Sequence, residues 1–227
     1  MQKCLPWEYP RKETYLRGIA VDPGNSKRIL LGFGDFTPGS SGAIAQTEDF
    51  GKSWKLSPLA AEPNSTMWTF GTNSDDPNTM FAASRYGYLY RSDDGGASWT
   101  VASTPIASGP TAGIFALAFR GQQHGLAVGG DFLAETASPD NFARTNDGGA
   151  SWNLLPAAPP EYRSGATWVD GHTAIAVGPS GSDVSTDAGT TWQPFDDGSL
   201  DTVDCARPTA CWASGANGRV AYLRRSH

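Results

Sequence analysis

Six charged side chains of this sequence are the ones whose types and positions could carry chemistry together. The acids are Asp35, Asp131 and Glu161, and the bases are Arg17, Arg85 and Arg163. Carboxylates in a cleft can donate and accept protons, and arginine holds a ligand carboxylate through two parallel hydrogen bonds. Gathered at one mouth with Trp68 and Tyr162, these groups predict a pocket in which the arginines bind a ligand and the acids do acid–base work.

Two of the acids occupy matching local sequences. Asp35 and Asp131 each stand at the centre of a Gly-Asp-Phe segment, and long loops follow at 37–42 and 133–141. Long loops in a compact domain are often functional. The competing interpretation is structural: aspartates cap their own loops, and arginines pair with acids as solvated ion pairs. Both interpretations stay open on the sequence alone.

An eight-residue motif that occurs four times indicates which elements position these residues. It reads TEDFGKSW at 47–54, SDDGGASW at 92–99, TNDGGASW at 145–152 and STDAGTTW at 185–192, and we call it the repeat motif. The third position is always Asp and the eighth always Trp, and successive aspartates lie 45, 53 and 40 residues apart. Periods of this length indicate repeated supersecondary units.

Each position of the repeat motif has a physical reason. Asp and Ser or Thr side chains hydrogen-bond to nearby backbone and close a tight turn. The glycine at the fifth position takes positive φ without a steric clash, and the tryptophan begins the next strand and packs in the core. The motif therefore predicts eight structural residues: Asp49, Trp54, Asp94, Trp99, Asp147, Trp152, Asp187 and Trp192.

The segments around the motifs predict four short strands per unit, with the motif between the third and the fourth. The expected units span 16–57, 66–103, 113–156, 165–196 and 202–225. The fifth unit has no motif and lacks an outer strand, which the N-terminal segment 3–9 is expected to supply. We therefore expect an all-β fold, a single-domain β-propeller of five four-stranded blades closed by the N-terminal strand. The alternative is a ring completed by a second copy.

The repeat motif resembles the Asp-box of the BNR-repeat β-propellers. Residues 17–100 are similar to sialidase- and xyloglucanase-type propellers, whereas 113–223 are similar to photosystem II assembly factors. In that family the Asp-box is structural, and the active site lies round the central axis on the opposite face. The expected strand order places the six charged candidates on that face, but the Arg-Ile-Pro phrase of the sialidases is absent. A glycosidase would need two carboxylates across a cleft, for which Asp35 and Asp131 are candidates.

Composition excludes several classes of function. A net charge of −6 argues against nucleic acid as a partner, and no apolar run is long enough to span a membrane. The three histidines show no metal-ligand spacing, so no metal and no cofactor are expected. No signal peptide is visible at the N-terminus, which indicates a cytosolic protein or a leader outside this numbering.

Two cysteines could report on the compartment. Cys205 and Cys211 flank a predicted hairpin turn, so they could form a disulfide, which would fit an oxidising, extracytoplasmic location, or remain buried thiols. Trp168 and Trp212 lie in strand patterns and are expected to pack between blades.

Two functions fit these observations. The sequence favours a non-enzymatic scaffold, a monomer that binds a protein, peptide or glycan on the loop face opposite the repeat motifs. The alternative is a glycoside hydrolase, sialidase-like or of another type, that uses axial carboxylates and arginines.

Overall fold

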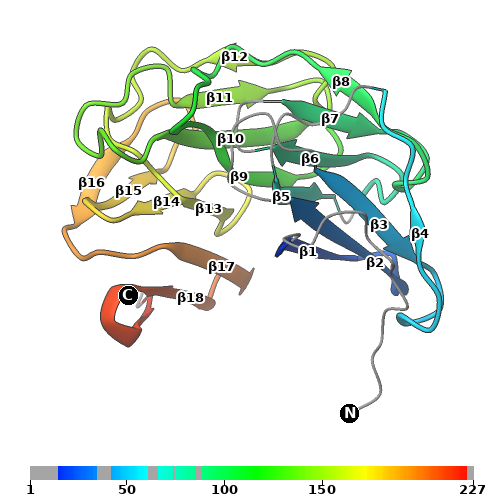
Figure 1. The fold of residues 1–227 in the computed structure, drawn as a ribbon. Helices are drawn as coiled ribbons and strands as arrows, with labels where there is room; N and C mark the ends of the chain where they lie inside the picture. The colour runs from blue at the N-terminus through cyan, green and yellow to red at the C-terminus, as the bar shows by residue number, and fades with distance from the viewer. Residues whose placement is uncertain (1–14, 35–41, 61–65, 74, 85–87, 224–227) are drawn as a thin grey trace.

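Strands make up nearly all the regular structure of the described chain. The computed structural model describes residues 15–34, 42–60, 66–73, 75–84 and 88–223. The one helical element in these ranges is a 3₁₀ turn, η1 (Ala216–Gly218). The strands form five antiparallel sheets, which are the blades of a five-bladed β-propeller (Figure 1). The expected all-β propeller fold is confirmed.

Each blade takes its strands in chain order. Blade one contains β1 (Tyr15–Asp22), β2 (Asn25–Gly34), β3 (Ala43–Thr47) and β4 (Lys55–Leu56). Blade two contains β5 (Met67–Thr72), β6 (Met80–Ser84), β7 (Leu89–Ser92) and β8 (Thr100–Ala102). Blade three contains β9 (Ala112–Arg120), β10 (His124–Asp131), β11 (Phe142–Thr145) and β12 (Asn153–Leu154). Blade four contains β13 (Gly165–Trp168), β14 (Ala174–Gly178), β15 (Gly181–Ser185) and β16 (Gln193–Asp196), and blade five contains β17 (Thr202–Arg207), β18 (Ala210–Gly215) and β19 (Arg219–Tyr222).

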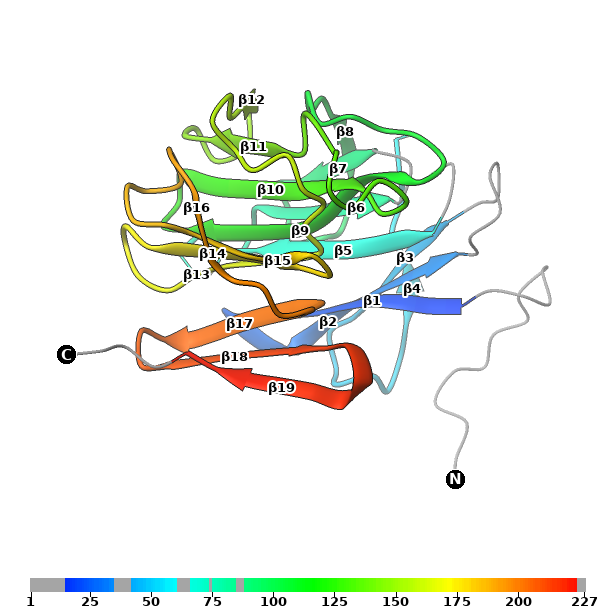
Figure 2. The same cartoon turned by 90° about the vertical axis from the view of Figure 1, so that its left-hand side faces the viewer.

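The first strands of the blades pack in sequence. β1 packs on β5, β5 on β9, β9 on β13, and β13 on β17. Blade five has three strands among the described residues, and β19 is its outer edge (Figure 2). The segment expected to complete this blade, residues 3–9, lies outside the described residues.

Each repeat motif folds as the turn between the third and fourth strands of blades one to four. In blade two, the Asp94 carboxylate accepts hydrogen bonds from the Ser98 amide at 2.9 Å, the Ser98 hydroxyl at 2.6 Å and the Ser92 hydroxyl at 2.8 Å. Gly96 has φ 87° and its amide donates to Ser92 Oγ. Asp49, Asp147 and Asp187 make the same set of bonds. The motif is thus a self-contained hydrogen-bonded turn.

The motif tryptophans pack into the seams between blades. Trp99 packs among side chains of blades one and two, Trp152 among blades two and three, and Trp192 contacts Phe142 of blade three at 5.1 Å between ring centroids. Trp54 of blade one is only partly buried, and packs with residues of its own blade. Three seams are therefore sealed by the next blade's motif.

The two other strand tryptophans differ from each other. Trp168 is buried and donates a hydrogen bond across the seam to the Ala118 carbonyl at 3.2 Å. The expectation for Trp212 is wrong, because this side chain is 56% exposed. Its neighbours Cys211 and Ala213 face blade four, so strand alternation turns Trp212 to the opposite side of the sheet.

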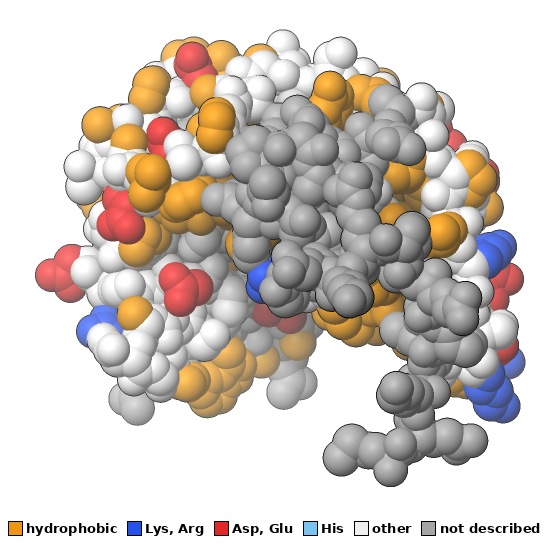
Figure 3. All heavy atoms as spheres, viewed as in Figure 1, with side chains coloured by type: hydrophobic (Ala, Val, Ile, Leu, Met, Phe, Trp, Pro, Cys, Tyr) orange, Lys and Arg blue, Asp and Glu red, His pale blue; other side chains and the backbone are white. Residues whose placement is uncertain are grey.

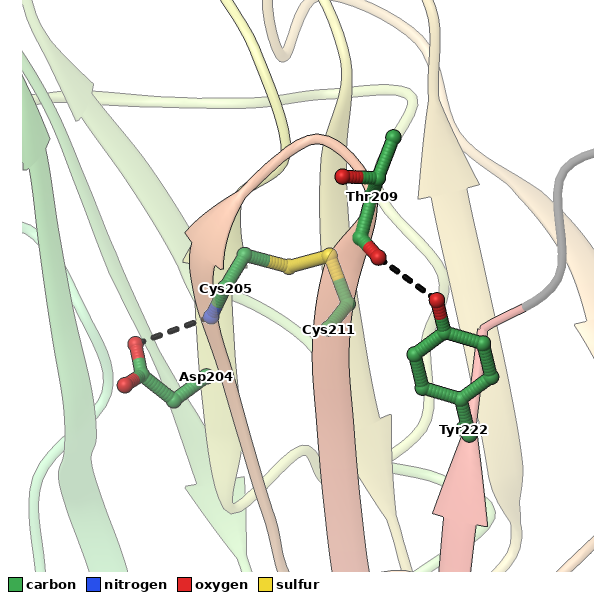
Figure 4. The surroundings of a disulfide bond; sticks show 5 residues. All are labelled: Asp204, Cys205, Thr209, Cys211 and Tyr222. Carbon is green, nitrogen blue, oxygen red and sulfur yellow. Dashed lines mark hydrogen bonds between the residues drawn. A yellow bond between two sulfur atoms is a disulfide. The ribbon is translucent and has the colours of Figure 1, made fainter.

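Cys205 and Cys211 face each other on β17 and β18 and are joined by a disulfide (Figure 4). Their Cα atoms are 4.0 Å apart. The Tyr222 hydroxyl on β19 donates to the Thr209 carbonyl in the same hairpin turn. Both links hold the three strands of blade five together.

Candidate functional site

A groove lined by described residues lies at the seam between blades three and four. Its volume is about 640 Å³. Three segments form it: the connection from β12 to β13, the turn between β14 and β15, and β16 with the residues after it. The lining comprises residues 157–161, Arg163, 180–183, Trp192 and 194–197.

A buried arginine forms the floor of the groove. Arg163 is 3% exposed, and its Nε donates to Asp183 Oδ2 at 2.6 Å. Nη1 donates to the Tyr162 carbonyl at 3.1 Å and to Ser180 Oγ at 3.0 Å, and Nη2 lies 3.8 Å from Glu161 Oε2. These partners occupy most of the guanidinium, so its role is to hold the floor together rather than to receive a ligand carboxylate.

Asp183, the acid that pairs with Arg163, is buried and has a raised pKa. It is 1% exposed and sits inside β15. Burial raises the pKa of its carboxyl above 3.8, because lost hydration outweighs the hydrogen bond and the charge of Arg163, and the charge of Glu161 acts in the same direction as burial. The carboxyl therefore keeps its proton to higher pH than an ordinary aspartic acid.

The walls combine apolar and acidic groups. Pro159, Pro160, Trp192, Pro194 and Phe195 supply the apolar surface, and Phe195 is 46% exposed. Glu161 lines the groove beside the floor, and Asp196 and Asp197 are exposed at its rim. Figure 3 shows acidic and hydrophobic side chains interspersed on the side of the molecule where β15 and β16 lie. Inside the groove, acids outnumber the one arginine.

One hydroxyl in the lining has no hydrogen-bond partner. Ser182 is 1% exposed, and its Oγ makes no hydrogen bond within the described part of the chain. Buried polar groups are nearly always satisfied. Side chains alternate along β15, so the Ser182 hydroxyl points to the opposite side of the blade from Asp183, towards blade five.

The aromatic residues predicted at the mouth do come together. Phe115 makes edge-to-face contacts with Trp68, at 5.5 Å between ring centroids, and with Tyr162, at 5.0 Å. Phe132 joins the same cluster at 6.2 Å from Phe115. The cluster connects blades two, three and four on the loop face.

Four of the six charged candidates lie within the described residues. The Asp131 carboxylate accepts the Leu133 amide at 2.9 Å and so caps its own loop. Arg17 lies exposed on β1 in blade one, away from the groove. Asp35 and Arg85 lie outside the described residues and stay predictions. Of the six, the structure brings together Glu161 and Arg163.

Several residues of the groove were not singled out from the sequence. Asp183, Ser180 and Ser182 went unnoticed, and Trp192 was assigned to the core alone. The repeats contained the signal for Asp183. Aligned on the repeat motif, its position holds Ala45, Tyr90 and Ala143 in the other blades, all fully buried. A carboxylate at a position reserved for buried side chains requires a partner.

Two kinds of feature are absent from the described residues. No group of three or more His, Cys, Asp or Glu is arranged to hold a metal ion. No helix in the described ranges is long and apolar enough to cross a membrane.

Comparisons with known proteins agree on the fold. No family model matches the chain. Over 162 residues it is 25% identical to a probable oligoxyloglucan-reducing end-specific xyloglucanase of Neosartorya fischeri, a match covering 67% of this chain and 19% of that protein. An ancestral GH74 enzyme has a TM-score of 0.66 at 18% identity, covering 90% of this chain and 28% of that one.

A second group of structures differs in its described role. YCF48 from Cyanidioschyzon merolae has a TM-score of 0.59 at 14% identity, over 95% of this chain and 68% of that one. YCF48 bound to a D1 peptide has the same score and identity, over 96% and 70%. At these identities the likeness shows the propeller fold alone. The chain spans about a fifth of the length of the curated xyloglucanase relative.

Proposed function

We propose that this chain is a non-enzymatic binding module that holds a basic peptide segment in the groove between blades three and four. The observation that carries the proposal is the groove's combination of apolar walls with surplus acid. Glu161, Asp196 and Asp197 line it, while its one arginine is committed to Asp183. A lysine or arginine side chain would meet the rim acids, and its aliphatic stem would lie on Phe195.

The comparisons support a peptide ligand without naming one. One similar structure is YCF48 bound to a D1 peptide, so a propeller of this shape can bind a peptide. The exposed ring of Phe195 is a further contact point for an extended chain. Because the rim acids are exposed, binding is expected to weaken as salt rises.

A peptide and glycan array on the purified protein tests the proposal. Peptides rich in lysine or arginine should be retained, whereas matched peptides with glutamate in those positions should not. The double variant Asp196→Asn/Asp197→Asn and the single variant Phe195→Ala should each weaken retention at least tenfold.

Asp75→Asn is the matched control. Asp75 is exposed on the face that carries the repeat motifs, so its substitution removes one negative charge and leaves the groove intact. Equal weakening by this control would reduce the effect to net charge and overturn the assignment to the groove. Retention that ignores both groove variants would do the same.

A specific observation also favours a second candidate, a glycoside hydrolase. Glu161 and Asp183 both lie against Arg163, and the pKa of Asp183 is raised, as a general acid requires. The 25% identity to a xyloglucanase supports the same candidate. Release of reducing ends from xyloglucan, abolished by Glu161→Gln and by Asp183→Asn, would favour it over the binding module.

A further inference from the structure

The seam between blades four and five contains an apolar cavity in place of a tryptophan. Blade five has no repeat motif, so no motif tryptophan enters this seam. A cavity of about 120 Å³ lies there instead. Its walls include Ile175, Val177, Ser182, Ala213 and Ala221. Apolar cavities of about this size accept an aromatic ring.

The strand registers identify this cavity with the tryptophan position of the other blades. Trp152, at the seam between blades two and three, packs in a cluster that includes Phe81, Ala83, Leu89, Ala127 and Ala143. The three blade-two residues have the same ladder positions as Ile175, Val177 and Ser182 of blade four. The two blade-three residues pair with each other as Ala213 and Ala221 of blade five do. The walls of a motif-tryptophan site are therefore present, and the described residues supply no motif tryptophan to it.

The neighbouring position on β15 is adapted to the missing motif. The residue just before each earlier motif reaches across the seam to a carbonyl of the next motif: Gln46 to Gly95 at 3.1 Å, Arg91 to Gly148 at 3.0 Å and Arg144 to Ala188 at 3.4 Å. In blade four this position is Val184, which packs with the apolar side chains of the cavity. The seam is therefore built for an apolar occupant without a motif turn.

One segment outside the described residues has the sequence of a fourth strand. After each motif tryptophan come a polar residue and then an apolar residue or proline, as in Trp99-Thr100-Val101. Trp7-Glu8-Tyr9 repeats this order. The polar residue pairs with the one just before the motif, as Thr100 does with Arg91.

The spacing to the next blade also agrees. The reference in each blade is the first-strand residue that pairs with Leu30, Phe81, Leu126, Ile175 or Trp212 of the second strand. The motif tryptophan of the preceding blade lies 17, 19, 15 and 12 residues before this reference in blades two, three, four and five. Trp7 precedes the equivalent residue of blade one, Ala20, by 13. The connection is thus long enough to cross from the outside of one blade to the inside of the next.

We propose that residues 3–9 form the fourth strand of blade five, antiparallel to β19, with the Trp7 ring in the cavity. The ladder then sets Glu8 opposite Tyr222 and Tyr9 opposite Ala221. Pro6 and Pro10 are acceptable because this strand lies at a sheet edge. The added strand covers the open edge of β19 and gives blade five the tryptophan that its own sequence lacks.

A double-mutant cycle on the full chain tests the placement. Trp7→Ala should lower the urea midpoint of unfolding and should speed amide exchange in residues 219–222 at least tenfold, because the β19 edge is uncovered. Ala221→Leu enlarges a cavity wall, so it should destabilise the wild type by displacing Trp7 and be neutral or stabilising in Trp7→Ala. Trp7→Phe keeps an aromatic ring and should retain most of the protection.

Leu133→Ala is the control, because Leu133 is 75% exposed in the loop after β10 of blade three and is not part of blade five. It should leave exchange in β19 unchanged. Additive effects of Trp7→Ala and Ala221→Leu would overturn the proposal. A dimeric mass in solution that Trp7→Ala converts to a monomer would instead assign the cavity to the Trp7 of a second copy, and so overturn the intramolecular arrangement.

Discussion

The repeat motifs and the groove between blades three and four both hold aspartates against hydrogen-bond donors, yet the pKa of these aspartates shifts in opposite directions. In the motifs, hydroxyl and amide donors lower the pKa of Asp49, Asp147 and Asp187 from 3.8 to about 2. In the groove, burial raises the pKa of Asp183 even though Arg163 is 2.6 Å away.

The opposite pKa shifts distinguish aspartates that only close a turn from an aspartate that lies in a candidate binding site. A motif carboxylate is exposed and closes a turn of its own segment, so its whole role is local. Asp183 is buried, its partner comes from another strand connection, and the pair forms the floor of a hollow. An acid whose pKa is raised by burial in a cleft is a candidate for a functional role, whereas the motif aspartates have the low pKa of saturated capping groups.

The largest expected effect is on the floor of the groove. Arg163→Met should destabilise the fold by about 3–5 kcal/mol, because it leaves Asp183 buried without a cation. Arg163→Met/Asp183→Ala should recover most of that loss, since alanine already occupies the equivalent position in blades one and three. Urea unfolding measures both. A single variant that costs less than about 1 kcal/mol would mean that the pair is solvated, and would remove the contrast with the motifs.

A smaller loss is expected from a motif. Asp94→Ala should cost about 1 kcal/mol, because three hydrogen bonds are lost but the site is open to water. Asp93→Ala, at the next residue, serves as the control and removes an exposed ion pair with Arg91 worth less. If the two variants unfold at the same urea concentration, the motif carboxylates contribute nothing special to the turn.

Acid titration should show the two regions with opposite signs. A motif aspartate binds its proton more weakly when folded, so the stability that it contributes is complete above about pH 4 and is lost as pH falls towards 2. Asp183 binds its proton more tightly when folded, so it contributes stability as pH falls through its raised pKa. Asp147→Asn should therefore flatten the acid loss and Asp183→Asn should steepen it, in urea midpoints measured from pH 7 to pH 2. Equal slopes would contradict the assigned directions.

How much of this could be predicted from the sequence depends on the range of the interactions. The motifs were predictable because Asp94, Gly96 and Trp99 act within one eight-residue turn. The pairing of Arg163 with Asp183 was not, because it depends on which blade packs on which and at what radius. The residue pattern around Cys211 predicted a strand, but it did not show which side chains of that strand face blade four. Trp212 was therefore assigned to a seam, although it points away from blade four.

The range of the interactions also explains where the charged candidates lie. The Gly-Asp-Phe segment at Asp131 was interpreted for both catalysis and loop capping, and the Leu133 amide accounts for its carboxylate by capping. Glu161 and Arg163 were among the candidates for the axial mouth, but they lie in a seam, because the connection before β13 runs along the groove. Sequence order assigned these residues to the loop face, and it could not give their positions along the seam.

The smallest expected effect on stability is at the groove wall. Glu161→Gln should change the unfolding free energy by less than about 0.5 kcal/mol, since its carboxylate is 3.8 Å from Arg163 and partly exposed. The same variant should still weaken binding of a basic peptide. A stability loss as large as that of Arg163→Met would place Glu161 in the floor rather than in the wall.

The most direct test of the central claim is a titration of isotope-labelled protein with a lysine hexapeptide, followed by amide chemical shifts, with a glutamate hexapeptide and cellohexaose as comparison ligands. Saturable shifts are expected in residues 180–183 and 193–197 with the lysine peptide alone, and they should be reduced by salt and absent from Asp196→Asn/Asp197→Asn. Shifts centred on the repeat motifs, or equal responses to all three ligands, would contradict this claim.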